Sequence, residues 1–105
     1  MNVKAWNNGS YHETGAGYGL AVTPVDRDAY FDREWGCIII EFESLSRTAQ
    51  VNIDKDSFWG ECRELISKDI GQWLIEHGYQ RWPWRQPPVF ALEPIFANRF
   101  RLSVV

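Results

Sequence analysis

The sequence is poor in the residues that build covalent or metal-bound frameworks. Its 105 residues include two cysteines, two histidines and one methionine. Cys37 and Cys62 lie in unrelated segments with no paired spacing, which argues against a disulfide scaffold and indicates a reducing, cytoplasmic setting. His12 and His77 supply two imidazoles, and a metal site needs more ligands than that. We therefore expect no metal and no cofactor.

Long apolar runs are also missing. No wholly apolar run exceeds four residues, as in Cys37–Ile40, whereas a membrane helix needs about 20. The chain does not open with a basic segment followed by an apolar stretch, as a secretory signal would. We expect no membrane partner.

An excess of basic charge is missing as well. The chain has 11 Lys and Arg against 14 Asp and Glu, a net charge of −3, which gives no general attraction to nucleic acid. The charge is uneven, because residues 79–105 carry four arginines and one glutamate. These arginines are interleaved with aromatic residues.

Aromatic side chains, in contrast, are abundant. They make up 15% of the chain and include six tryptophans, within a total apolar content of 45%. This content excludes disorder and is enough for one compact core, so we expect a single domain over residues 1–105. It also supplies material for pockets or interfaces.

Apolar alternation and turn residues predict the elements of the N-terminal half. Strands are expected over residues 3–6, 18–23, 35–43 and 47–53, and a short helix over 26–31 with Asp26 as its cap. The last two strands should form a hairpin through a turn at 44–46.

From Asp56 to Gly78 the apolar period changes to 3.6. One expected helix carries Phe58, Cys62, Leu65 and Ile66, and a second begins at a Ser67 cap and ends at Gly78. A loop over 79–88 and a hairpin of 89–95 with 99–104 complete the chain. The expected fold class is α+β, a mostly antiparallel sheet with a two-helix insertion packed on one face.

The glycine-rich stretch Gly9–Gly19, GSYHETGAGYG, is neither a P-loop nor a dinucleotide fingerprint. No Gly-Lys-Ser/Thr follows it, its spacing is GxGxG, and the next segment is a predicted strand. It is therefore a structural bend or the wall of a pocket. His12 and Glu13 point to opposite sides of an extended chain, which weakens a joint acid–base role.

Other reactive side chains have ordinary structural explanations. His77 in the last turn of its helix favours a packing or capping role. Cys62 on a helix core face would be an inert thiol. Glu41 and Glu43 share a strand face about 6–7 Å apart, which is typical of a solvated face, with paired-carboxylate chemistry as the alternative.

The tract Arg81–Arg85, RWPWR, combines two tryptophans with flanking arginines. It could stack on bases, hold a peptide or form an interface hot spot, or its tryptophans could close the end of the core. Arg99 and Arg101 could extend the same positive surface toward single-stranded nucleic acid. The acidic overall charge argues against that extension.

Several short motifs together resemble a group of short bacterial proteins of unassigned function, some of them carried on the mobile gene cassettes of integrons. The motifs are TGAGYG at 14–19, DRDAYF at 26–31, SFWGEC at 57–62, IGQWL at 70–74, and the segment from WPWRQPP to NRF at 82–100. The resemblance implies a bacterial cytoplasmic protein that forms homo-oligomers, and it assigns no catalytic residues.

The main hypothesis is a non-catalytic binding or interaction module. We expect a homodimer, since Ile39 and several tryptophans need burial, with an aromatic-lined small-molecule pocket near Gly9–Gly19. Its expected ligand-binding residues are Tyr18, Arg27, Trp59 and Trp82. One alternative is a small enzyme that uses His12 with Glu13 or Cys62. The other is single-stranded nucleic-acid binding through the Arg/Trp-rich C-terminal third.

Overall fold

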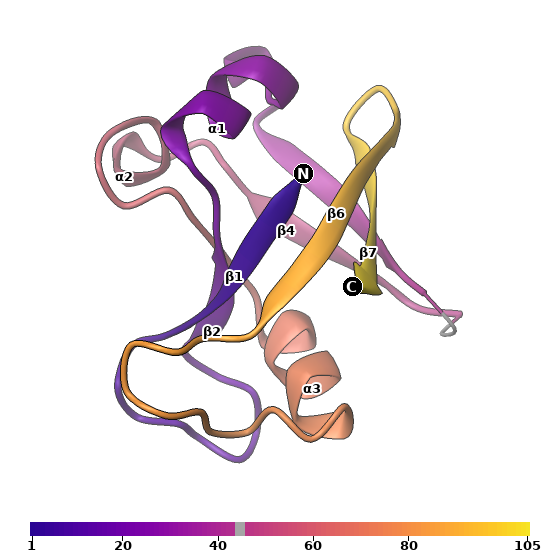
Figure 1. Cartoon of the computed structure of the whole chain (residues 1–105). Helices are drawn as coiled ribbons and strands as arrows, with labels where there is room; N and C mark the ends of the chain where they lie inside the picture. Colours follow the sequence, from indigo (N-terminus) through magenta and orange to yellow (C-terminus); the bar gives the residue numbers. More distant parts are fainter. Residues whose placement is uncertain (44–45) are drawn as a thin grey trace.

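The computed structural model describes residues 1–43 and 46–105, in which seven strands form one sheet (Figure 1). The strands are β1 (Asn2–Asn7), β2 (Tyr18–Ala21), β3 (Cys37–Phe42), β4 (Thr48–Asn52), β5 (Glu64–Ile66), β6 (Val89–Phe96) and β7 (Arg99–Val104). The helices are α1 (Pro24–Tyr30), α2 (Asp56–Trp59) and α3 (Lys68–Glu76), with a 3-10 turn at Arg33–Trp35.

The strand order in the sheet is β4-β3-β7-β6-β1-β2-β5. Neighbouring strands run antiparallel except β3 and β7, which pair in parallel with Ile39 opposite Arg99. The fold is therefore α+β with a mostly antiparallel sheet, as the sequence predicted.

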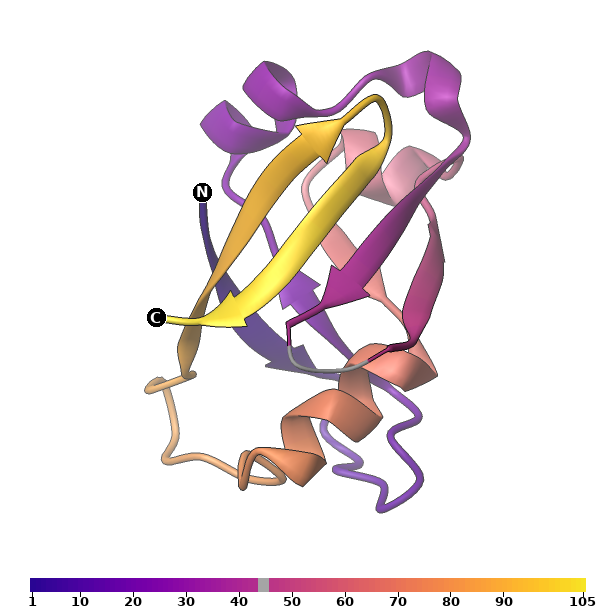
Figure 2. The ribbon, with the colours of Figure 1, turned by 90° about the vertical axis from the view of Figure 1, so that its right-hand side faces the viewer.

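The sheet curls until its two edge strands, β4 and β5, come into contact (Figure 2). One face of every strand then points inward, which explains the alternating burial of β3 and β4. The inward residues are fully or nearly fully buried and aliphatic or aromatic: Val3, Ala5, Leu20, Ile38, Ile40, Ala49, Val51, Leu65, Phe90, Leu92, Phe100 and Leu102. This interior is the hydrophobic core of the protein.

Helices lie at both ends of the curled sheet, α1 and α2 at one end and α3 at the other (Figure 1). Aromatic side chains pack against the core at both ends. At one end, Trp73 of α3 stacks on Phe42 at 6.0 Å and meets the Phe90 ring edge-on at 5.1 Å. At the other end, Phe31 stacks on Phe100 with ring centroids 4.9 Å apart and meets Phe58 of α2 at 5.4 Å. The helices thus cover the two open ends of the core and shield it from solvent.

The first helix of the predicted pair is much shorter than expected. Helix α2 ends at Trp59, and Arg63 has a positive φ of 53° that a helix cannot accommodate. The residues that follow form strand β5 where a helix was expected, and Leu65 of β5 pairs with Leu20 of β2. The helical spacing of Leu65 and Ile66 was coincidental, because Leu65 is buried whereas Ile66 is 41% exposed.

The placement of Cys62 is a second correction. The sequence placed its thiol on a buried helix face, but Cys62 precedes β5 and is exposed. Its backbone amide bonds to the Ser57 carbonyl at 3.1 Å in the turn that follows α2.

The second helix of the pair forms as predicted. The Ser67 hydroxyl accepts from the Asp69 amide at 3.1 Å, and Gly78 takes a φ of 84° after the last turn. His77 caps this end, where its Nδ1 donates to the Trp73 carbonyl at 2.8 Å. The capping role expected of His77 is therefore confirmed.

The remaining predicted elements are also confirmed, with small differences at their ends. Helix α1 is capped by Thr23 in place of Asp26, because the Thr23 hydroxyl accepts from the Asp26 amide. The hairpins β3–β4 and β6–β7 form as expected. The predicted turn at 44–46 includes residues 44 and 45, which lie outside the described residues.

Candidate functional site

Helix α3 packs directly on the backbone of the glycine-rich stretch. A Cβ atom on Gly15 would lie 2.6 Å from the Lys68 carbonyl oxygen and 2.8 Å from the Gln72 amide, and Gly71 faces Gly15 in return. Backbone therefore rests directly on backbone, which side chains at these positions would prevent. Of the two interpretations of this stretch, these contacts favour the structural bend.

Gly15→Ala should lower the free energy of unfolding by about 2–5 kcal/mol, because the new methyl group meets α3 and the φ of 91° is left-handed. Gly9→Ala is the matched control, since Gly9 has a φ of 100° with nothing within 4 Å. The control should cost about 1–2 kcal/mol. Equal losses in urea unfolding would contradict the backbone contact.

His12 and Cys62 do not share a site. The ladder between β2 and β5 runs from Gly19 opposite Ile66 to Ala21 opposite Glu64. His12 precedes one end of this ladder and Cys62 precedes the other. His12 is exposed and its Nδ1 lies 2.8 Å from the Thr14 hydroxyl. In residues 1–43 and 46–105, no three His, Cys, Asp or Glu side chains are grouped to hold a metal ion.

Tyr18 and Trp82 belong to an aromatic cluster with Tyr11. This cluster lies between the loop that follows β1 and the loop over residues 79–88. Tyr18 is fully buried, and its hydroxyl donates to the Gln80 carbonyl. The Trp82 ring lies 6.3 Å from Tyr18 and 5.5 Å from Tyr11, and the Arg81 guanidinium stacks 4.9 Å above Tyr11. These contacts fix the loop over residues 79–88 to the N-terminal loop.

Arg27 and Trp59 form a different pair, which fixes α1 to α2. Arg27 donates to the carbonyls of Phe58 and Gly60 at 3.1 and 2.8 Å, and its guanidinium lies 5.8 Å from the Trp59 ring. The Trp59 indole donates to the Ile53 carbonyl at 2.8 Å. These donors are thus used within the chain.

The four expected ligand-binding residues therefore lie in two groups. Tyr18 and Trp82 are at the end of β2 where the strand begins, whereas Arg27 and Trp59 are beyond the end where it stops. They do not line one pocket.

The second tryptophan of the RWPWR tract points to solvent. Trp84 is 80% exposed, and the Arg85 guanidinium stacks on its ring at 4.3 Å. The Gln86 amide bonds to the Pro83 carbonyl at 2.9 Å, which tightens the loop under these residues. The two tryptophans have separate roles, because Trp82 packs and Trp84 is presented.

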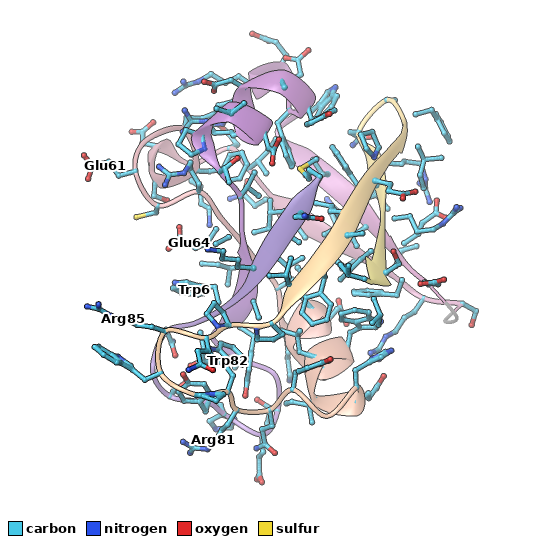
Figure 3. All side chains as sticks on the ribbon, viewed as in Figure 1. Trp6, Glu61, Glu64, Arg81, Trp82 and Arg85 are labelled. Atoms are coloured by element: carbon cyan, nitrogen blue, oxygen red, sulfur yellow. The ribbon has the colours of Figure 1, made fainter. Side chains whose placement is uncertain are left out.

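The outer face of β1, β2 and β5 continues from this loop. We call it the tryptophan face, and it is made up of Lys4, Trp6, Ala21, Glu64, Ile66, Trp84, Arg85 and Val89. Residues opposite one another in antiparallel strands share a face. Trp6, Gly19 and Ile66 form one such row, with Lys4, Ala21 and Glu64 in the next. Figure 3 shows Trp6 between Glu64 and Arg85 along one side of the molecule.

Glu64 has an unusual setting on this face. Its Oε2 is buried and has no hydrogen-bond partner among the described residues. Burial raises the pKa of the Glu64 carboxyl, against a smaller opposing effect from Lys55. Sequence reasoning missed both Glu64 and Trp6. The two residues share a face only because β5 is a strand that pairs with β2, and the sequence predicted a helix there.

Glu64→Gln should increase the free energy of unfolding at pH 7, because it removes a desolvated charge. A carboxyl whose pKa is raised on folding destabilises the fold above that pKa, and the penalty vanishes below its unfolded value of 4.5. The gain should therefore shrink as the pH falls through the raised pKa toward 4.5, and it should be absent below 4.5. Glu61→Gln, three positions away and exposed, is the control, and an equal gain there would contradict the burial argument.

A hollow of about 600 Å³ lies on another part of the surface, over β3, β4 and β7. Its lining residues are Glu41, Phe42, Glu43, Ser46, Arg47, Thr48, Arg99 and Arg101. Glu41 pairs with Arg99 at 3.1 Å and with Arg101 at 3.6 Å, and Arg47 pairs with Glu76 at 3.3 Å. These charges are largely compensated within the chain.

Arg99 and Arg101 do not extend the positive surface of the RWPWR tract. Arg99 pairs with Phe96 at the far end of β6, whereas the tract precedes Val89 at the near end. Ile39 lies opposite Arg99 and Gln50 and is half-buried on this outer face.

Comparisons with models of protein families, with curated proteins and with solved structures find no match to this chain. In residues 1–43 and 46–105, no helix has the length and apolar character to span a membrane.

Proposed function

We propose that this chain is a non-catalytic interaction module that binds a protein partner through the tryptophan face. The observation that carries the proposal is Trp84, whose side chain is 80% exposed on a loop that is fixed on both sides. Exposing so large an apolar ring has a cost in water that a bound partner would remove.

The loop that presents Trp84 is pre-organised. Trp82 packs against two tyrosines on one side of it, and the Arg85 stack holds the Trp84 ring on the other. Tryptophan and arginine dominate interface hot spots, and a fixed side chain loses little entropy on binding. The loop therefore has the properties of an anchor.

The two alternatives have less support. The enzyme hypothesis needs a nucleophile and a base within hydrogen-bond reach, and the ladder of β2 and β5 separates His12 from Cys62. The nucleic-acid hypothesis needs a continuous positive surface, whereas Arg99 and Arg101 pair with Glu41 away from Trp84.

Site-specific photo-crosslinking tests the proposal. Trp84 is replaced by p-benzoylphenylalanine, and the chain is irradiated in an extract of the cells that carry its gene. We expect a discrete protein adduct, because Trp84 would lie within the interface. Tyr30 on α1, 43% exposed, is the control position and should give no such adduct. Equal labelling from both positions, or none from position 84, would refute the proposal.

A small-molecule ligand is the second candidate, favoured by the size of the hollow over β3, β4 and β7. A ligand of the native state raises the melting temperature with its concentration. A screen of nucleotides, sugars and amino acids should then give a saturable shift that Arg101→Ala removes, while Arg85→Ala retains it. A flat screen would leave the protein-partner proposal in place.

The setting of this module is part of the proposal. Both cysteines are free thiols, which supports a reducing cytoplasm. The motifs resemble those of short bacterial proteins, some carried on integron gene cassettes, and this resemblance supports a bacterial source.

A further inference from the structure

The tryptophan face carries opposite charges at its two ends. Glu61 and Glu64 lie toward one end, Trp6 is in the middle, and Arg85 lies toward the other end (Figure 3). Ile66 is in the same row as Trp6, and Lys4 is in the next row beside it. Lys4 shares the row of Glu64 through Ala21. The order from Glu61 and Glu64 through Trp6 to Arg85 is therefore acidic, apolar and basic, with one lysine beside the acidic end.

A surface with this order is complementary to itself. A two-fold axis through its centre reverses the direction of one copy, so that the acidic end of each copy meets the basic end of the other. The apolar centres then face each other. A partner surface with a single sign of charge would be repelled at one end, and nucleic acid would be repelled by Glu61 and Glu64.

We propose that the tryptophan face is the interface of a two-fold homodimer, in which Trp6 packs on the partner's Trp6 and Arg85 pairs with the partner's Glu64. This inference rests on the proposed function and names its partner as a second copy of the chain.

The dimer would cover apolar surface and offset charge that the single chain leaves on this face. Glu64 is half-buried there, and its negative charge would be offset by the partner's Arg85 guanidinium. Ile66, in the same row as Trp6, is 41% exposed, and Val89, opposite Lys4 in the next row, is 40% exposed. An apolar centre with a charged rim is the usual anatomy of an interface.

Sedimentation velocity on a dilution series of the purified chain tests the dimer. The wild-type chain should sediment at twice the mass of one chain and dissociate on dilution. Trp84→Ala should raise the dissociation constant of the dimer more than about tenfold, as expected for a hot-spot tryptophan. Because Trp84 is 80% exposed, the variant should keep the far-UV circular dichroism spectrum of the folded chain. Trp35→Phe, which is outside this face, should leave the dimer unchanged.

An exchange of charges tests the two-fold arrangement itself. Arg85→Glu places like charges at both ends of the dimer, and Glu64→Arg does the same. Each variant alone should raise the dissociation constant of the dimer more than about tenfold. A mixture of the two variants restores both pairs and should form a heterodimer. Glu61→Arg replaces Glu64→Arg if the latter loses the far-UV circular dichroism spectrum of the folded chain.

The outcomes separate this inference from the proposed function. A wild-type chain that stays monomeric at every concentration overturns the homodimer, and so does a dimer that none of the charge or tryptophan variants weakens. Two monomeric variants that fail to associate on mixing overturn the Arg85 and Glu64 pairing. The proposed function survives each of these results if Trp84 still crosslinks to a different protein in the cell extract, and it fails if no adduct forms there.

Discussion

The parallel pairing of β3 with β7 is the contact on which the rest of the structure depends. It joins the β3–β4 hairpin to the other five strands, and without it the sheet would be two pieces. The Asn98 side chain donates to the Cys37 carbonyl at 3.1 Å beside this junction, and Glu41 bridges to Arg99 and Arg101 across it. The β3–β7 pairing makes one continuous sheet, which can curl. The curling places one face of each strand in the core and leaves the other face at the surface.

Local features of the fold could be predicted from the sequence, whereas β5 could not. Alternation in β3 and β4, the Ser67 cap and the Gly78 stop are signals within a few residues of each other, and all gave the right element. Residues 64–66 are too few to show a period of two. Their strand conformation depends on pairing with β2, more than 40 positions earlier, which no local pattern reports.

The candidate site was predictable only in part. The RWPWR tract was recognisable from two tryptophans flanked by arginines in a proline-interrupted loop. The sequence left open that both tryptophans close the core and favoured Trp82 for binding, whereas Trp82 packs and Trp84 is the exposed one. Trp6 and Glu64 were not, because their common face exists only once β1, β2 and β5 are neighbours. Tyr18 and Arg27 have side chains typical of binding sites, yet each is used to hold backbone carbonyls together.

The junction of β3 and β7 also determines how the chain can fold. Ile39 and Arg99 are 60 positions apart, so we expect their pairing to raise the contact order and to slow folding. Until β7 arrives, β3 is an open edge that carries three consecutive isoleucines. Glu41 and Glu43 on that edge then act as gatekeepers against aggregation. We therefore expect the Glu41 carboxylate, which bridges two arginines in the folded chain, to hinder aggregation of β3 before β7 pairs with it.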